Sequence, residues 1–370
     1  MIRKLAGGRY EVAVDQGKDS SGKRLRTWRR ARTRKDAVSL EANLIAQRDT
    51  GITVTPGAIT VSEFLDRWLQ DHAEPNLKEK TTHRYREIIN LHLHPVIGSI
   101  PLAKLRPMHV QTAYSKVQES GRSPRTALHV HRLLRTALQH AVKWQLLARN
   151  PADACDAPKV PASEIDLPDL DAIQRLLTVA DGTRYGPMVR LTLETGLRLG
   201  EASGLRWSDV DLDGATLRVA QAVAWIPGKG CQITTPKTAR SRRVIALSQP
   251  AVQALRQHRL AQQEYRLRLG PMFEDHGLVF PSVIGTPLNP SNIYRAWKKI
   301  TAEAGVRMRF HDLRHASATL ALAEGVNVRV VSDRLGHANA NVTLSVYAHV
   351  MAGADAEAAE RISAALSRTG

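Results

Sequence analysis

Alternating apolar and polar positions open the chain and soon give way to helical spacing. Residues 7–33 alternate through Tyr10, Val12 and Val14, which predicts two or three short strands. Residues 33–48 then place apolar side chains three and four positions apart and start with a capping-box pattern. The first part of the chain is therefore predicted to be a small sheet backed by one helix.

A second region is helical throughout. The polar residues 49–58 are predicted to form a linker, and apolar residues recur at three and four from Val61 onwards. Four segments have this spacing: 62–69, 81–93, 106–118 and 124–144. They predict a compact unit of four helices.

Four prolines interrupt the helices between residues 150 and 168 and mark a second linker. Beyond Pro168 the pattern is helical again, apart from a strand region over residues 215–248. The predicted fold class is mainly α with small β-sheets (α+β). The predicted domains are residues 1–57 with their linker, residues 58–151, a linker over 152–167, and residues 168–370, which fits a chain of 370 residues.

Positive charge is concentrated in the first two of these domains. The chain has a formal net charge of +18, and 43% of its residues are hydrophobic. Residues 1–57 hold 13 basic and 6 acidic side chains, and residues 58–151 hold 14 and 7. Because basic side chains gain affinity by releasing counterions from phosphates, this distribution favours a polyanionic partner. A basic surface that only confers solubility is the alternative.

The chain lacks the patterns of an exported or membrane protein. Its longest apolar runs fall well short of the ~20 residues that a bilayer span requires, and no signal peptide opens it. We therefore expect a cytoplasmic protein.

Four polar islands stand out in the apolar surroundings of the last domain. They contain Arg198 with Glu201, Lys237, the pair His311 and Arg314, and His337 with Tyr347. Each island alone is typical of ordinary structure. An arginine after a turn or a lysine beside a proline is usually solvated, and a tyrosine in a helix usually belongs to the core.

The order and spacing of the islands are more specific. Lysine follows the first arginine by 39 residues, the His-x-x-Arg motif comes next, and Leu-Gly-His precedes Tyr347 by ten. This series resembles the tyrosine recombinases, also called phage integrases. In outline the resemblance covers the whole chain and implies an arm-type DNA-binding domain, a helical core-binding (SAM-like) domain and a catalytic domain.

The chemistry of these residues agrees with phosphodiester cleavage. Arg198 and Arg314 can clamp the non-bridging oxygens as charge develops, and His311 and His337 can donate to those oxygens or move the phenol proton. Tyr347 is the expected nucleophile. The expected product of its attack is a 3′-phosphotyrosine. A second DNA end can attack this linkage and rejoin the strand, by way of a Holliday junction.

Three further residues complete the expected catalytic set. Lys237 is the candidate general acid for the leaving 5′ oxygen, because an ammonium can supply a proton there. Glu201, one turn after Arg198, can hold its guanidinium in place. His315 either packs locally or takes part in catalysis, and we favour local packing. No step requires a metal or another cofactor.

The resemblance also implies partners. They are double-stranded DNA attachment sites with core and arm sequences, and further copies of this chain in a homotetramer on paired sites. A host DNA-bending protein and an excision factor are candidate accessory partners. In the first domain, Arg26, Arg29 and Arg30 on the second or third strand are expected to face DNA.

Three other functions are alternatives to an integrase of a phage or mobile element. His311 and His315, four residues apart, could ligate zinc in a metal-dependent nuclease, but no glutamate of the HEXXH type lies between them. A non-catalytic DNA-binding regulator is disfavoured because every catalytic position is filled. A recombinase that resolves chromosome dimers remains an alternative, although the extra residues 1–57 favour the integrase.

Overall fold

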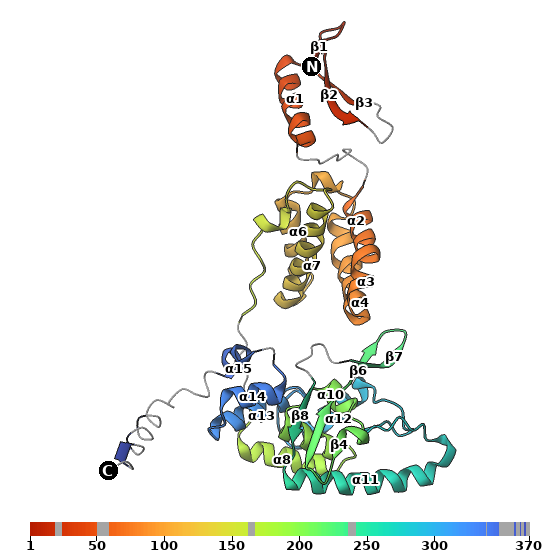
Figure 1. Cartoon of the computed structure of the whole chain (residues 1–370), viewed down its shortest axis with the longest axis vertical. Helices are drawn as coiled ribbons and strands as arrows, with labels where there is room; N and C mark the ends of the chain where they lie inside the picture. The colour runs from red at the N-terminus through yellow and green to blue at the C-terminus, as the bar shows by residue number, and fades with distance from the viewer. Residues whose placement is uncertain are drawn as a thin grey trace. The chain divides into compact units, whose positions relative to one another are not determined.

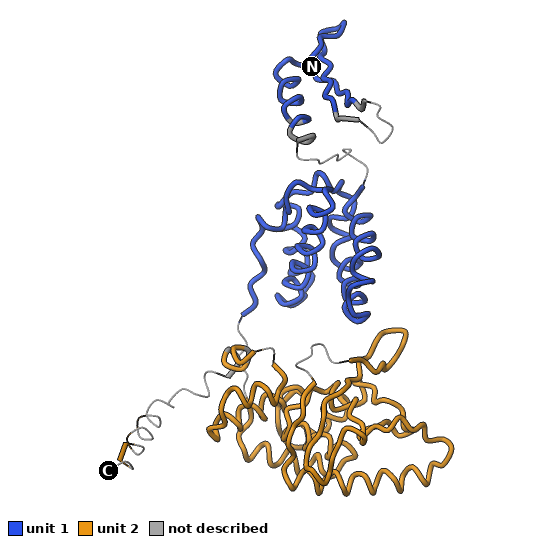
Figure 2. Tube along the Cα trace, viewed as in Figure 1, with its two compact units in different colours: residues 1–162 blue, residues 163–370 orange. Residues whose placement is uncertain are grey.

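The computed structural model describes residues 1–18, 24–49, 59–161, 167–235, 242–337 and 339–347, together with residues 359, 363, 366 and 367. The chain divides into two compact units, residues 1–162 and residues 163–370 (Figure 2). Hydrophobic side chains in the first unit form two separate cores, one in an N-terminal sheet and one among helices.

The N-terminal part is an antiparallel sheet with one helix packed on it. Strands β1 (Ile2–Lys4), β2 (Tyr10–Lys18) and β3 (Arg24–Ala31) lie in that order, and α1 (Arg34–Asp49) covers one face (Figure 1). Val12 and Val14 are buried against Ala37 and Leu44, as the alternation and the helical spacing predicted. The Thr33 Oγ1 accepts from the Asp36 amide at 3.1 Å and begins α1 at the predicted cap.

The helical part consists of four long helical segments, two of which contain a π-helical turn. The elements are α2 (Val61–Trp68), η1 (Leu69–Ala73), α3 (Glu74–Asn76), α4 (Glu79–Ile88), η2 (Ile89–Leu93), α5 (His94–Ile97), η3 (Leu102–Lys104), α6 (Pro107–Glu119) and α7 (Pro124–Lys143). Thr60 and Glu63 form a reciprocal capping box at the start of α2. The core between the helices contains Phe64, Trp68 and Leu134, each with no exposed surface.

The second unit combines helices with two small sheets. Its elements are α8 (Leu170–Asp181), α9 (Gly186–Thr195), α10 (Leu199–Ser203), η5 (Trp207–Asp209), β4 (Val210–Asp211), β5 (Thr216–Val219), β6 (Ala222–Ile226), β7 (Gly230–Thr234), β8 (Arg243–Ala246), α11 (Gln249–Leu269), η7 (Gly270–Met272), α12 (Pro290–Glu303), α13 (Asp312–Ala323), α14 (Val328–Leu335) and α15 (Ala340–Tyr347). Strands β4, β5 and β8 form one antiparallel sheet, and β6 pairs with β7 as a hairpin. In Figure 1 the hairpin and α11 lie at opposite edges of this unit.

These elements confirm the predicted fold class, a mainly α chain with small sheets. The predicted domain boundaries stay predictions, since residues 50–58 and 162–166 lie outside the described residues. One stretch differs from the expectation of a linker. Pro151–Ala154 forms a short 3-10 helix, η4, that packs on α6 and α7. An ion pair between Arg135 and Asp153, at 2.7 Å, holds it there.

Two glycines allow α10 to lie directly on the backbone of β6. A Cβ on Gly204 would stand 2.8 Å from the Cα of Ala222, and a Cβ on Gly200 would stand 2.7 Å from the carbonyl oxygen of Val223. No side chain fits between these backbones. This close approach fixes the separation between α10 and strand β6 of the hairpin.

We predict that Gly204→Ala lowers the free energy of unfolding by about 1–3 kcal/mol, the usual cost of overpacking, because the methyl group would meet β6 backbone that cannot move aside. Gly182→Ala is the matched control, since its Cβ would meet only the Val179 carbonyl oxygen at an ordinary 3.5 Å. Urea unfolding of both variants measures the difference. Equal effects of the two substitutions would contradict the close-packing argument.

Candidate functional site

The first predicted arginine lies at a turn that glycine makes possible. Gly196 ends α9 in the left-handed region, with φ of 66°, and the chain then turns into α10, which Arg198 caps. The Arg198 amide donates to Oε2 of Glu201 at 3.1 Å, and its Nη1 donates to Oε1 at 2.7 Å. Glu201 therefore holds the Arg198 guanidinium, as predicted from their spacing.

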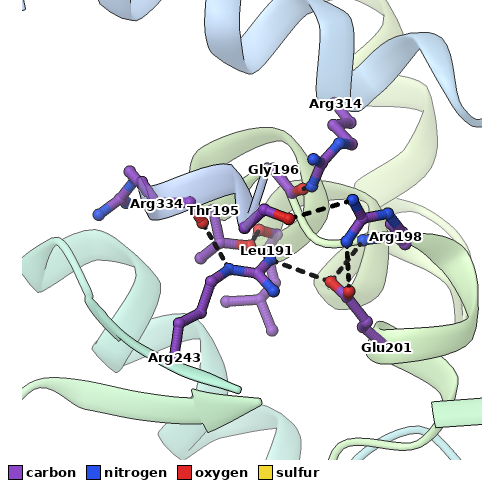
Figure 3. A network of polar contacts seen from close by, with 9 residues as sticks. Leu191, Thr195, Gly196, Arg198, Glu201, Arg243, Arg314 and Arg334 are labelled. Carbon is purple, nitrogen blue, oxygen red and sulfur yellow. Dashed lines mark hydrogen bonds and ion pairs between the residues drawn. The ribbon is translucent and has the colours of Figure 1, made fainter. Parts of the chain in front are cut away.

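The Glu201 carboxylate is buried between two guanidiniums. Its side chain is 5% exposed, and Arg243 Nη2 donates to its Oε2 at 3.0 Å. Burial acts to raise the pKa of Glu201, but the charges of Arg243 and Arg198 outweigh it and hold that pKa below its usual range. Figure 3 shows the two arginines reaching this carboxylate from different elements.

Arg243 was missed by the sequence interpretation. It is the first residue of β8, and its side chain is only 7% exposed. Its Nε donates to the carbonyl oxygen of Arg334 at 2.6 Å, near the end of α14. An arginine at the start of an amphipathic strand gives no signal of this role, because the partner lies 42 residues away in sequence.

The second predicted arginine reaches the same turn from another helix. Arg314 lies on α13, is 3% exposed, and donates from Nη1 to the carbonyl oxygen of Gly196 at 2.6 Å. Leu313 and Ala316 beside it are buried and fix the helix. Figure 3 shows Arg314 directed toward the turn that leads to Arg198.

Two histidines flank Arg314. His311 precedes α13 as its N-cap, and its ring meets the His315 ring edge to face, with centroids 5.1 Å apart. His311 is exposed overall, yet partial desolvation and the Arg314 charge lower its pKa. Burial and His311 lower the pKa of His315 to about 4. His315 thus packs against His311, which agrees with the local packing that we favoured for it. A role of His315 in catalysis stays an alternative.

His337 follows the glycine that ends α14. Gly336 adopts φ of 67°, and its carbonyl oxygen lies 3.5 Å from Arg198 Nη2. The Nδ1 of His337 lies 2.8 Å from the Thr343 hydroxyl on α15, a side chain with no exposed surface. Burial, Arg314 and Arg198 lower the pKa of His337 to about 4. The structure therefore brings Arg198, Arg314 and His337 together.

Two of the predicted catalytic side chains, those of Lys237 and Tyr347, are not described. Lys237 lies in residues 236–241, outside the described residues. Tyr347 is the last residue of α15, so its backbone position is described and its side chain is not. Their predicted roles stay predictions.

The sheet register separates the three arginines expected to face DNA. Arg29 pairs with Val12, whose side chain is buried, so Arg29 projects from the face that α1 covers. Trp28 pairs with Ala13, so Arg26, Trp28 and Arg30 belong to the opposite, open face. Trp28 is 50% exposed there.

The described part of the chain contains neither a candidate metal centre nor a membrane-spanning helix. His, Cys, Asp and Glu side chains nowhere gather there in a group of three that could hold a metal ion. Among the same residues, no helix combines the length and apolar character that crossing a bilayer demands.

Two sequence-family profiles match parts of the chain. A profile described as the phage integrase family matches residues 169–353. A profile described as the N-terminal SAM-like domain of phage integrases matches residues 60–118. The first match covers half of the chain and contains all the residues of the arginine site.

Two curated relatives are similar over most of their length. The prophage phiRv2 integrase of Mycobacterium tuberculosis is 31% identical over 314 residues, which cover 83% of this chain and 79% of that protein. A XerC-like tyrosine recombinase of Caldanaerobacter subterraneus is 28% identical over 364 residues, covering 92% of each.

Two solved structures have a similar fold. The Tn1549 transposon integrase in complex with a circular intermediate DNA superposes with a TM-score of 0.68 at 21% identity, over 82% of this chain and all of that one. A lambda integrase tetramer bound to a Holliday junction gives 0.56 at 18% identity, over 91% and 95% of the two chains.

We predict that the free energy of unfolding falls as the pH is lowered from 7 to 4. Folding lowers the pKa values of His315 and His337 to about 4, whereas in the unfolded chain these pKa values return to ~6.5. Between those pH values the unfolded chain binds more protons, so acid favours it. At pH 5 the proton that each histidine binds in the unfolded chain should lower the free energy of unfolding by about 1 kcal/mol, after allowance for solvent screening.

Urea unfolding at pH 7 and pH 5 measures this effect. His315→Asn and His337→Asn should each flatten the dependence, and His276→Asn, which removes an exposed histidine of the same unit, serves as the control. An unchanged slope in both site variants would show that these histidines are not buried as described.

Proposed function

This chain belongs to the phage integrase family, the tyrosine recombinases, and is a site-specific recombinase of the integrase type; we propose how its residues divide the reaction among themselves. The observation that carries the assignment is the arginine site. Arg198 and Arg314, 116 positions apart, meet at the turn that begins with Gly196. Both guanidiniums are held by neighbouring groups, so little reorganisation is needed when a phosphate binds.

Arg198 and Arg314 clamp the scissile phosphate. Each guanidinium presents donors in a planar fork that suits two phosphate oxygens, and the clamp stabilises the extra negative charge of the transition state. The side chain of Arg198 is 39% exposed and can reach solvent or DNA while Glu201 holds its other edge. Glu201 is thus a supporting residue and does not itself touch the phosphate.

His311 and His337 bind the same phosphate from the sides. Because the lowered pKa of each imidazole keeps it neutral at pH 7, each can donate one N–H to a phosphate oxygen or accept a proton from the attacking phenol. The Thr343 hydroxyl fixes the ring orientation of His337. The negative charge of an arriving phosphodiester raises the pKa of both histidines and favours this proton uptake.

Tyr347 is the nucleophile and Lys237 is the general acid. The Tyr347 oxygen attacks phosphorus and loses its proton to a base in the site, while the bond from phosphorus to the 5′ oxygen breaks. Lys237 gives that oxygen its proton. The 3′-phosphotyrosine keeps the energy of the broken bond, so a 5′ hydroxyl from a second DNA end can reverse the step. No metal takes part.

The DNA partners follow from the charge distribution and the relatives. We propose that the helical part and the catalytic unit bind a core attachment site, and that four copies assemble on paired sites through a Holliday junction, as the lambda integrase tetramer does. Residues 1–57 then bind arm sites through the open face of the sheet. The reaction takes place on intracellular DNA, in the cytoplasm.

A recombinase that resolves chromosome dimers is the second candidate, favoured by the similarity to a XerC-like protein. The basic N-terminal sheet favours an integrase, because an additional DNA-binding domain can hold a distant arm site while the other domains hold the core site. Integration assays on an element's own attachment sites distinguish the two.

We predict that Tyr347→Phe abolishes the covalent protein–DNA adduct and leaves DNA affinity within about threefold of the parent, since one phenolic oxygen contributes little to binding but supplies the nucleophile. The measurement is denaturing gel electrophoresis after incubation with attachment-site DNA. Tyr294→Phe, which alters an exposed phenol on α12, is the matched control and should keep the adduct. An adduct that persists in Tyr347→Phe would assign the nucleophile elsewhere.

We predict that Arg30→Gln and Trp28→Ala weaken binding to long attachment-site DNA more than Arg29→Gln does, because only the first two change the open face of the sheet. Arg30→Gln should also lower the salt dependence of log affinity by about 0.9, the value for one phosphate contact. Binding to a short core-site duplex should not change. A larger loss for Arg29→Gln would place DNA on the other face.

A further inference from the structure

Four side-chain contacts close a ring around the arginine site. Arg198 Nη1 binds Glu201 Oε1 at 2.7 Å, and Glu201 Oε2 binds Arg243 Nη2 at 3.0 Å. Arg243 Nε binds the Arg334 carbonyl at 2.6 Å, and two residues later the Gly336 carbonyl lies 3.5 Å from Arg198 Nη2. The ring thus joins α10, β8 and the end of α14, and most of it is visible in Figure 3.

Arg243 occupies the inner side of this ring. Its side chain is 7% exposed, against 39% for Arg198, and its Nε and Nη2 already donate to the Arg334 carbonyl and to Glu201, so its guanidinium is occupied inside the protein. Its side chain also packs against Gly336, where a Cβ would stand 3.0 Å from Nη1 and 3.3 Å from Cζ. A side chain at residue 336 would therefore require Arg243 to shift by a few tenths of an ångström.

We propose that Arg243 is a positioning residue for strand cleavage, which fixes Arg198 through Glu201 and fixes His337 through the backbone of residues 334–336. This inference rests on the proposed function of the site. Without Arg243, the carboxylate of Glu201 has only Arg198 to neutralise it and turns both oxygens toward that guanidinium. Arg198 then presents fewer donors to the phosphate, and the end of α14 loses one of the hydrogen bonds that hold it to β8.

The consequence is specific to the chemical step. Outer parts of the protein still bind DNA, so affinity should be nearly unchanged, whereas a displacement of about 1 Å in catalytic groups can reduce a rate by about 100-fold. Removing the Arg243 charge should also let the pKa of His337 rise toward its ordinary range, because Arg243 is one of the cations that lower it. That shift is a second, independent readout.

The test uses the full chain and a nicked core-site substrate that traps the covalent adduct. Arg243→Gln should slow single-turnover adduct formation by about 100-fold and Arg243→Lys by about tenfold, since lysine keeps the charge but not the fork. DNA affinity of both variants should stay within about threefold of the parent. The double variant Arg243→Gln/Glu201→Gln should cleave faster than the product of the two single effects predicts, because it removes the unbalanced carboxylate.

Arg218→Gln is the matched control. Arg218 lies on the neighbouring strand β5 and shares a buried carboxylate, Asp209, with Arg206, just as Arg243 shares Glu201 with Arg198. It has no contact with the ring, so its cleavage rate should match that of the parent. Loss of cleavage in this variant would indicate that any broken ion pair in the unit disables the enzyme.

The outcomes separate the inference from the proposed function. If the parent chain forms no adduct on its own sites, the proposed function fails. If the parent forms the adduct and Arg243→Gln cleaves within threefold of it, or loses binding and cleavage in proportion, the positioning role is wrong. Should Arg243→Gln not fold, Arg243→Lys decides by the same rate and affinity, and because lysine keeps the charge, its His337 pKa, titrated by NMR, should stay lowered.

Discussion

The arrangement of the arginine site depends on one buried carboxylate. Glu201 has lost almost all of its hydration, and a lone carboxylate in that position would take up a proton or disrupt the fold. Arg198 and Arg243 replace the lost water with ionic hydrogen bonds, so all three groups must keep their places. The requirement to satisfy this charge therefore fixes the direction of Arg198, the guanidinium that we propose binds the DNA phosphate.

Close backbone approaches make that charge network possible. The left-handed glycines Gly196 and Gly336 end α9 and α14 and turn their carbonyl oxygens toward Arg314 and Arg198. Gly204 brings the end of α10 onto the backbone of β6. Because these carbonyls belong to the backbone, they add fixed acceptors to the one that Glu201 supplies. The site is thus built on the scaffold, with few degrees of freedom left to the arginines.

The same positive charges set the state of the histidines. Three guanidiniums and partial burial keep His337 neutral, so its ring can take a proton only when an anion enters the site. In the proposed mechanism a substrate phosphate supplies that anion. Binding and proton transfer would then be coupled electrostatically, because the phosphate raises the basicity of the imidazole that we propose as acceptor of the phenol proton. Such a base becomes active when the substrate is present.

The sequence by itself determined the local elements and the basic N-terminal half, and it predicted the reactive residues. The alternation over Tyr10 to Val14 and the helical spacing from Val61 are local patterns. The arginine, histidine and tyrosine islands follow one another along the chain in a recognisable order. Only the tertiary structure could decide that Arg243 pairs with Glu201, because strand β8 and helix α10 meet through packing, and nothing in either segment records the other. It likewise separated Arg29 from Arg26 and Arg30, since the face of each strand residue depends on the register with β2 and on which side α1 covers.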